Sequence, residues 1–263
     1  GMISFDAPVG KWGFGGQIIN YRAGFGNYNV LQAAGSAGYT VSLDRSKYHN
    51  LSFGIQAGIT QKSIDIPLHT FDNQYNTHGG GNFDNSLNSG ESFASRSVLV
   101  PVTNAGILYY FSKQQSKLNP FVGVSGFNLI EPKESFFSAD NTLAFRYYIH
   151  AGTRINIAEK VYLIPKLLIM QQETIKEQTM ALDAGMYFES AEMYLLGGVI
   201  FRNRDAAILT IGVRKENYIL KVAYDINVSS LSGASTGRGG FEVSFTYMKK
   251  KENPKNVKIC PRL

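Results

Sequence analysis

The residues that could support catalysis or metal binding are few, and their spacing matches no catalytic or metal-binding motif. The chain has four His and one Cys. His69 and His78 lie in one polar stretch, but neither has the spacing to a third His or Cys that a zinc site requires. No Gly-x-Ser-x-Gly, His-Glu-x-x-His or P-loop sequence occurs. We therefore expect no cofactor and no bound metal.

One histidine, His150, shares the polar side of a predicted strand with charged residues. A Ser-His-acid hydrolase needs a carboxylate that orients the imidazole, and Asp183 or Glu242 could supply one. No nucleophile, base and acid can be assembled into a complete set around this single inward histidine. We therefore expect that the protein is not an enzyme.

Seven ionisable residues alternate with apolar residues along the predicted strands and form a candidate charge network. They are Arg146, His150, Arg154, Asp183, Lys221, Asp225 and Glu242. One interpretation is an ion-pair network in a narrow lumen, where poorly hydrated charges satisfy one another. The other is a conduction or binding path. We adopt the first as the working hypothesis.

Long strands with two different faces must position these charges. In the last predicted strand, Phe241, Val243 and Phe245 alternate with Glu242 and Ser244. A period of two over about nine residues predicts a strand. A soluble β-sandwich alternates as well, but these polar sides collect Gly, Ser, Thr and opposite charges, as a narrow lumen would. Because membrane-crossing strands need roughly 9–11 residues, we predict an all-β fold, an antiparallel transmembrane β-barrel with its apolar face towards lipid.

The pattern predicts about twelve strands and no helix with convincing periodicity. The predicted strands are residues 10–22, 31–44, 50–62, 103–112, 119–130, 143–157, 161–172, 178–188, 192–202, 206–215, 218–228 and 239–248. Pro8, Pro67 and Pro101 are expected in connections, because proline lacks the amide that a ladder needs. Pro120 and Pro165 are expected within strands.

The predicted connections alternate in length along the chain. Those after odd-numbered strands are mostly long, and those after even-numbered strands are all short. Outer-membrane barrels have long external loops and short periplasmic turns, so we expect the long set to face outwards. The longest, residues 63–102, is interpreted as a disordered external loop, a lumen plug, or a metal or glycan site.

The charge of the chain is uneven. The net charge is +6, and much of the excess lies near the end, in Lys249, Lys250, Lys251, Lys255, Lys258 and Arg262. We therefore divide the chain into a barrel, residues 1–248, and a basic tail, residues 249–263, which is a candidate partner-binding segment. A basic cluster attracts nucleic acid or anionic lipid, but a solvated tail is the simpler interpretation. The first residues lack the basic and apolar regions of a signal peptide, so we expect a mature or truncated chain.

Several segments of the chain share a recognisable pattern, and they are Leu196–Arg202, Ile211–Arg214, Val222–Val228, Leu231, Phe241–Glu242, Arg146–Tyr148, Ala151–Gly152 and Cys260–Arg262. Together these segments resemble the PorP/SprF family of outer-membrane barrels of type IX secretion and gliding motility systems. Family members usually begin with an Asn-Pro-Ala segment and further strands. The resemblance therefore implies about fourteen strands in the full-length protein.

The resemblance also implies a function. It implies an accessory barrel in the bacterial outer membrane that supports export or surface attachment of secreted protein substrates. The implied partners are outer-membrane lipid, periplasmic lipoprotein or ring components of the secretion machinery, and the substrates, but not nucleic acid. A solute-transport barrel, similar to fatty-acid channels, is the alternative. A steady open pore would favour transport, and a filled lumen would favour the accessory role.

Overall fold

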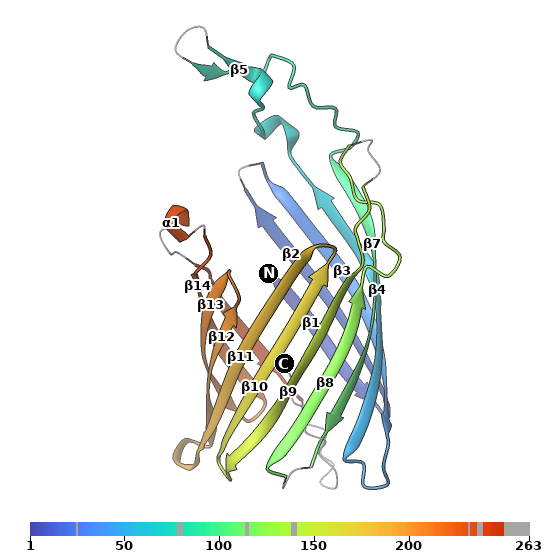
Figure 1. Ribbon diagram of the computed structural model, residues 1–263, viewed down its shortest axis with the longest axis vertical. Helices are drawn as coiled ribbons and strands as arrows, with labels where there is room; N and C mark the ends of the chain where they lie inside the picture. Colours follow the sequence, from blue (N-terminus) through green and yellow to red (C-terminus); the bar gives the residue numbers. More distant parts are fainter. Residues whose placement is uncertain are drawn as a thin grey trace. The chain divides into compact units, whose positions relative to one another are not determined.

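The chain folds almost entirely into antiparallel strands, which confirms the predicted fold class. The structure, a computed structural model, describes residues 1–24, 26–77, 81–113, 116–137, 141–230, 232–235 and 239–249. Within these residues one 13-stranded sheet follows the order of the chain from β1 to β15, with β4 next to β7, and β5 and β6 form a small sheet of their own (Figure 1). None of the helices described is long and apolar enough to cross a membrane.

The strands of the large sheet are mostly ten or more residues long. They are Met2–Val9 (β1), Trp12–Ala23 (β2), Tyr28–Ser42 (β3), His49–Ser63 (β4), Ser97–Phe111 (β7), Leu118–Phe127 (β8), Arg146–Ala158 (β9), Val161–Gln172 (β10), Ile175–Phe188 (β11), Met193–Arg202 (β12), Ala206–Lys215 (β13), Tyr218–Asn227 (β14) and Phe241–Tyr247 (β15). The small sheet and the short helices are Tyr75–Asn76 (β5), Asn82–Phe83 (β6), Ile66–Leu68 (η1), Asp72–Gln74 (η2), Glu189–Ala191 (η3) and Ser232–Ser235 (α1).

Each predicted strand overlaps an observed one, and the sequence analysis missed the strand β1 and the two short strands β5 and β6. The strand β1 pairs with β2 from Met2↔Ile19 to Val9↔Trp12. Pro8 lies within β1 and Pro101 within β7, so their expected place in connections is wrong. At Pro8 the missing amide is tolerated because β1 is an end strand in the order of the sheet. Pro67 lies in η1, outside the sheet, as predicted.

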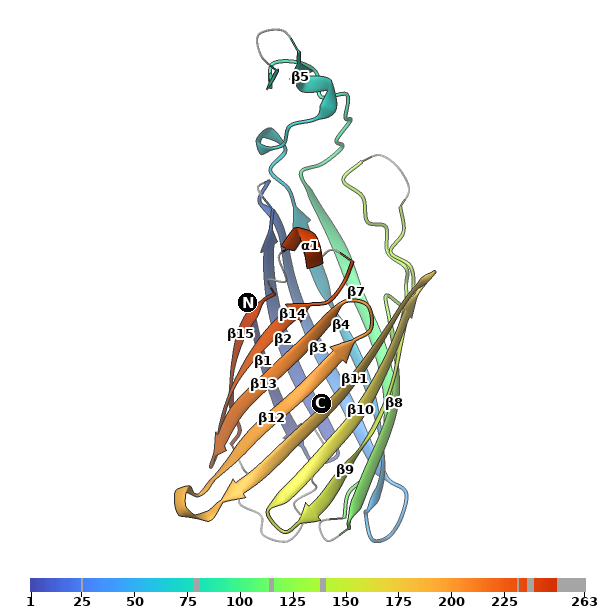
Figure 2. The ribbon, with the colours of Figure 1, turned by 60° about the vertical axis from the view of Figure 1, so that its left-hand side comes forward.

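The longest connection is shorter than predicted. Residues 97–102 belong to β7, so the segment between β4 and β7 is residues 64–96. It contains η1, η2 and the β5–β6 hairpin, and it is therefore not without structure. Figures 1 and 2 both show this hairpin beyond the ends of β4 and β7.

The chain divides into two compact units, which are described separately. Unit 1 comprises Gly1–Tyr39, Phe53–Gly106 and Gly126–Arg146. Unit 2 comprises Thr40–Ser52, Ile107–Ser125 and Tyr147–Leu263. In unit 2 the strands β10 to β15 pair consecutively and antiparallel, and Figure 2 shows β10 to β14 side by side, with short turns at their lower ends.

One face of the sheet is apolar and exposed, and we call it the outer face. Leu220 and Phe245 are directly opposite each other on β14 and β15, and their side chains are 44% and 66% exposed. On β4, Phe53, Ile55 and Ile59 are exposed while Thr60 on the other face is buried. These apolar residues belong to a single sheet, which excludes the β-sandwich alternative for this fold.

The opposite, inner face is packed by its own side chains in unit 2. Tyr110, Phe121 and Ile164, from β7, β8 and β10, form a cluster in which each is less than a tenth exposed. Leu108 and Tyr162 pack against it. Burying an apolar side chain stabilises a fold by about 1.5–3 kcal/mol, so this cluster is a core built on the face that the sequence predicts to be polar.

Tight turns fix the register between neighbouring strands. The β1–β2, β10–β11 and β13–β14 turns have two residues each, and Gly10, Glu173 and Glu216 occupy their first positions with positive φ. Glycine adopts this left-handed conformation freely, whereas a glutamate there is strained. The two glutamates are therefore held in place by the strand pairing around them.

Candidate functional site

The inner face of unit 2 carries an ion pair close to its apolar cluster. Lys166 Nζ on β10 lies 2.7 Å from Asp183 Oδ2 on β11, and both side chains are less than a third exposed. Gly198 on β12 is directly opposite Asp183. A Cβ there would lie 2.4 Å from Asp183 Oδ1 and 2.8 Å from Thr210 Oγ1, so a glycine is needed for this close approach.

A second group of charges joins the far end of β12 to β14. Arg202 lies 2.9 Å from Asp205 in the following turn and 3.4 Å from Asp225 on β14. The sequence analysis named Asp183 and Asp225 but not their partners Lys166 and Arg202. Those partners depend on strand register, which the alternation of residue types does not give.

An aromatic and arginine cluster lies where β9 to β13 approach the short turns. The guanidinium of Arg154 lies 3.8 Å from the ring centroid of Tyr162, and its Nε donates a hydrogen bond to Asn156 Oδ1. Arg214 lies 5.7 Å from the ring of Tyr194. Arg154 was predicted as a site residue, whereas Arg214 was not.

The remaining predicted charges lie apart from these pairs. His150 packs beside Phe121 and against Gly123 on the inner face. Arg146 lies over the ring of Phe127 in unit 1. The stem of Lys221 crosses Gly212, and Glu242 is exposed on β15. Of the seven predicted charges, Asp183 and Asp225 lie in the ion pairs with Lys166 and Arg202, and a single network that joins all seven stays a prediction.

The predicted tail is described only at its first residue. Lys249 is exposed. The other basic residues of the candidate partner-binding segment, Lys250, Lys251, Lys255, Lys258 and Arg262, lie outside the described residues.

Two long connections of unit 1, residues 64–96 and 128–145, are fastened to each other. Phe93 and Phe137 form an isolated antiparallel bridge, and their rings stack at 4.7 Å. Phe71 adds a third ring, 5.9 Å from Phe93. Lys62 at the end of β4 pairs with Glu134. Ring stacking and an ion pair therefore hold the connection 128–145 against the connection 64–96 and the end of β4, and we call these contacts the loop latch.

The β5–β6 hairpin presents exposed aromatic residues within an acidic segment. Tyr75 and Phe83 are directly opposite each other, their rings lie 5.2 Å apart, and both are about half exposed. Hydrogen bonds from the Ser86 hydroxyl and amide hold the pKa of Asp84 below its usual value. This carboxyl group is therefore charged at neutral pH.

The described residues of the loops include His69, which the sequence analysis considers as a candidate metal ligand. The described residues contain no group of three or more His, Cys, Asp or Glu that could hold a metal ion. His69 packs beside Phe71, and His78 lies outside the described residues.

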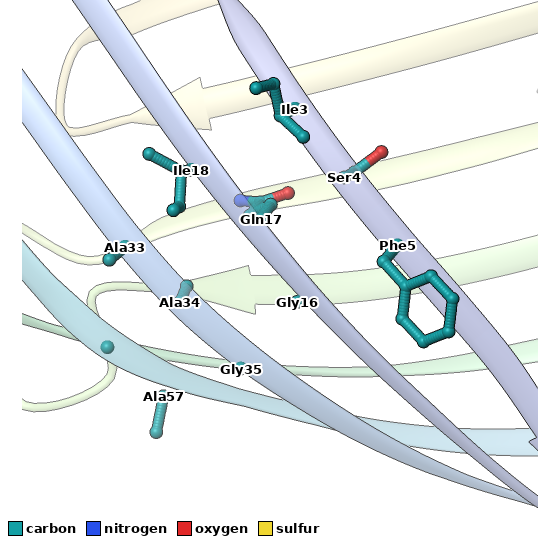
Figure 3. Close-up of a pocket in the computed structure, with 11 residues that line it drawn as sticks. Ile3, Ser4, Phe5, Gly16, Gln17, Ile18, Ala33, Ala34, Gly35 and Ala57 are labelled. Atoms are coloured by element: carbon teal, nitrogen blue, oxygen red, sulfur yellow. The ribbon is translucent and has the colours of Figure 1, made fainter. Parts of the chain in front are cut away.

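The outer face of β1 to β4 contains a shallow hollow of about 480 Å³. Figure 3 shows Ile3, Phe5 and Ile18 bordering Gly16 and Gly35, whose missing side chains leave the space. No titratable side chain lines it. The hollow is therefore a recess in an apolar face and not a catalytic pocket.

A family model decides the relationship of the chain to known proteins. The model of the type IX secretion system membrane protein PorP/SprF matches residues 1–247. The chain belongs to the PorP/SprF family. This match confirms the predicted family. Its members are membrane components of a secretion system, and the family is not a family of enzymes. A membrane protein also agrees with an outer face covered by lipid.

No curated protein matches the chain. Among solved structures, the crystal structure of the Ralstonia pickettii toluene transporter TbuX is similar, with 11% identity, a TM-score of 0.48, and coverage of 86% of this chain and 75% of that one.

Proposed function

We propose that this PorP/SprF protein is an accessory outer-membrane β-barrel of the type IX secretion system that supports export or surface attachment of substrate proteins. The observation that carries the proposal is the packed inner face of unit 2. Tyr110, Phe121 and Ile164 are buried there, and the Lys166–Asp183 pair lies on the same face. A barrel that conducts solutes needs a hydrated path along this face, and side-chain packing opposes one.

The latched loops support a role in contacting proteins outside the membrane. Residues 64–96 include the four acidic residues Asp65, Asp72, Asp84 and Glu91, against Arg96 and no lysine. Exposed Tyr75 and Phe83 lie within this acidic segment. Aromatic residues are enriched at protein interfaces, and complementary charge favours association. A substrate protein with a basic surface around an apolar patch would fit these loops.

The basic tail, residues 249–263, is proposed as a periplasmic arm. Six basic residues and one glutamate give it a strongly positive charge, which favours an acidic surface on a periplasmic lipoprotein or ring component. Deleting residues 249–263 should leave the folded sheet intact and reduce the recovery of periplasmic partners in a pull-down. Unchanged recovery would remove this role.

Isolation of the native protein with mild detergent tests the proposal most broadly. Components of the secretion machinery and a secreted substrate should co-purify. A Tyr75→Ala/Phe83→Ala variant should lose the substrate and keep the machinery, because the hairpin lies apart from the large sheet. A Leu118→Ala variant, altered at an exposed outer-face residue, is the matched control. If neither machinery nor substrate co-purifies with the unaltered protein, the proposed function is wrong.

A further inference from the structure

Five residues of unit 2 form a cluster on the inner face that no comparison assigns to any role. Tyr187, Tyr194 and Arg214 lie directly opposite one another in a row across β11, β12 and β13. Tyr162 of β10 lies beside this row, with its ring 6.3 Å from that of Tyr194, and Arg154 of β9 covers Tyr162. The cluster thus crosses five strands near the turns that join them.

The geometry of the cluster is fixed by packing. The rings of Tyr187 and Tyr194 lie 4.9 Å apart. Tyr162 is directly opposite Gly185, and a Cβ at that glycine would lie 2.3 Å from the Tyr162 ring. Gly185 therefore leaves the space that the ring occupies. The hydrogen bond from Arg154 Nε to Asn156 Oδ1, 3.1 Å long, orients the guanidinium over that ring.

Arg154 and Arg214 differ from Lys166 and Arg202, the cations of the inner face that form ion pairs. Lys166 has Asp183, and Arg202 has Asp205 and Asp225. Within the described part of the chain, neither Arg154 nor Arg214 has a carboxylate within ion-pair distance. A third cation, Lys221, lies diagonally beside Arg214, because it is directly opposite Gly212. Positive charge therefore accumulates here without a carboxylate partner from the described residues.

A half-buried guanidinium without a counter-ion is poorly solvated, and an anion would stabilise it. Arginine presents a planar fork of donors that matches carboxylate and phosphate groups, and stacking on an aromatic ring leaves this fork free. The three tyrosines of the cluster also carry hydroxyl groups, which are neutral hydrogen-bond donors. The chemistry of the cluster is therefore that of an oxyanion site.

We propose that Arg154 and Arg214, supported by Tyr162, Tyr187 and Tyr194, bind a phosphate-bearing ligand on the inner face. The phosphate could come from a small soluble compound or from a lipid headgroup. The cluster lies on the face opposite to the apolar outer residues, which favours the soluble source. This proposal stands independently of the proposed role in secretion.

Titration calorimetry of the full chain in zwitterionic detergent tests the site, with inorganic pyrophosphate as the probe. The unaltered protein should bind it, and an Arg154→Gln/Arg214→Gln variant should bind at least about tenfold more weakly, because each charge-assisted hydrogen bond contributes about 1.5–3 kcal/mol. Arg202→Gln is the matched control, since it removes an inner-face arginine that already has carboxylate partners, and binding should stay within about twofold.

A second variant tests whether weaker binding by the glutamine variant results from loss of folding. Arg154→Lys/Arg214→Lys keeps both charges and loses the planar fork, so its affinity should fall between the two extremes. Repeating the titration with phosphatidylglycerol vesicles present identifies the source: competition would support the site and name the headgroup as its ligand. Absence of pyrophosphate binding to the unaltered protein, or equal binding by the folded glutamine variant, would overturn the proposal.

Discussion

The aromatic rings of two regions of the molecule make different contacts. In the loops of unit 1, Phe71, Phe93 and Phe137 stack on one another and fasten two acidic connections together. On the inner face of unit 2, Tyr162 and Tyr194 instead support two arginines. The first region lies in connections rich in acidic residues, whereas the second contains two arginines without a carboxylate within ion-pair distance among the described residues. Since both regions are built on aromatic rings, we expect the charge beside the rings to decide which ligands each region binds.

The largest effect should come from removing the core of the inner region. Phe121→Ala should lower the free energy of unfolding by about 3–5 kcal/mol, because Phe121 is 3% exposed and its loss opens a cavity. Urea titration in detergent measures the free energy of unfolding, with the folded fraction read from heat-modifiability on gels. Val124→Ala on the outer face of the same strand is the control and should have a much smaller effect. Equal losses in both variants would mean that the inner face is not packed.

The next effect should come from the ion pair beside that core. Lys166→Met should lower the free energy of unfolding by about 1–3 kcal/mol, because Asp183 is left half-buried and unpaired. Lys166→Met/Asp183→Leu should cost less than the sum of the two single changes. The double-mutant cycle measures the coupling. Strict additivity would show that the two charges do not interact.

Breaking the loop latch should have a local effect. Phe93→Ala removes a ring that contacts both Phe71 and Phe137. Trypsin should then cleave after Lys133 about tenfold faster, because aromatic pairs contribute roughly 0.5–1.5 kcal/mol each beyond buried area and local opening becomes easier. Phe83→Ala, in the separate hairpin, is the control. Equal cleavage rates in Phe93→Ala and the unaltered protein would argue against the latch.

The smallest effect concerns a turn that belongs to neither region. Glu216 has φ 48° at the start of the β13–β14 turn. Glu216→Gly should change the free energy of unfolding by less than about 1 kcal/mol and in the stabilising direction, since glycine adopts this conformation without strain. The same urea titration measures it. A loss of more than about 1 kcal/mol would show that the Glu216 side chain makes a contact that matters more than backbone strain.

The sequence predicts the strands well, because apolar and polar residues alternate along a strand wherever one of its faces contacts lipid. Phe53 and Ile55 on β4 are exposed as their spacing indicates. The prediction places Pro8 in a connection and so omits β1, which contains this proline. Sequence alone could not identify Lys166, Arg202 or Arg214 as partners in the site, since their neighbours depend on strand register. It also missed the inner core, because Tyr110 and Phe121 stand on strands whose two faces are both largely apolar.

Planar-bilayer recording of the purified full chain tests whether side-chain packing on the inner face opposes conduction. Phe121 and Tyr110 are buried on the inner face of unit 2. We therefore expect no steady conductance from the unaltered protein and a measurable one from a Phe121→Gly/Tyr110→Gly variant that remains folded. A steady open pore in the unaltered protein would contradict this expectation and favour solute transport.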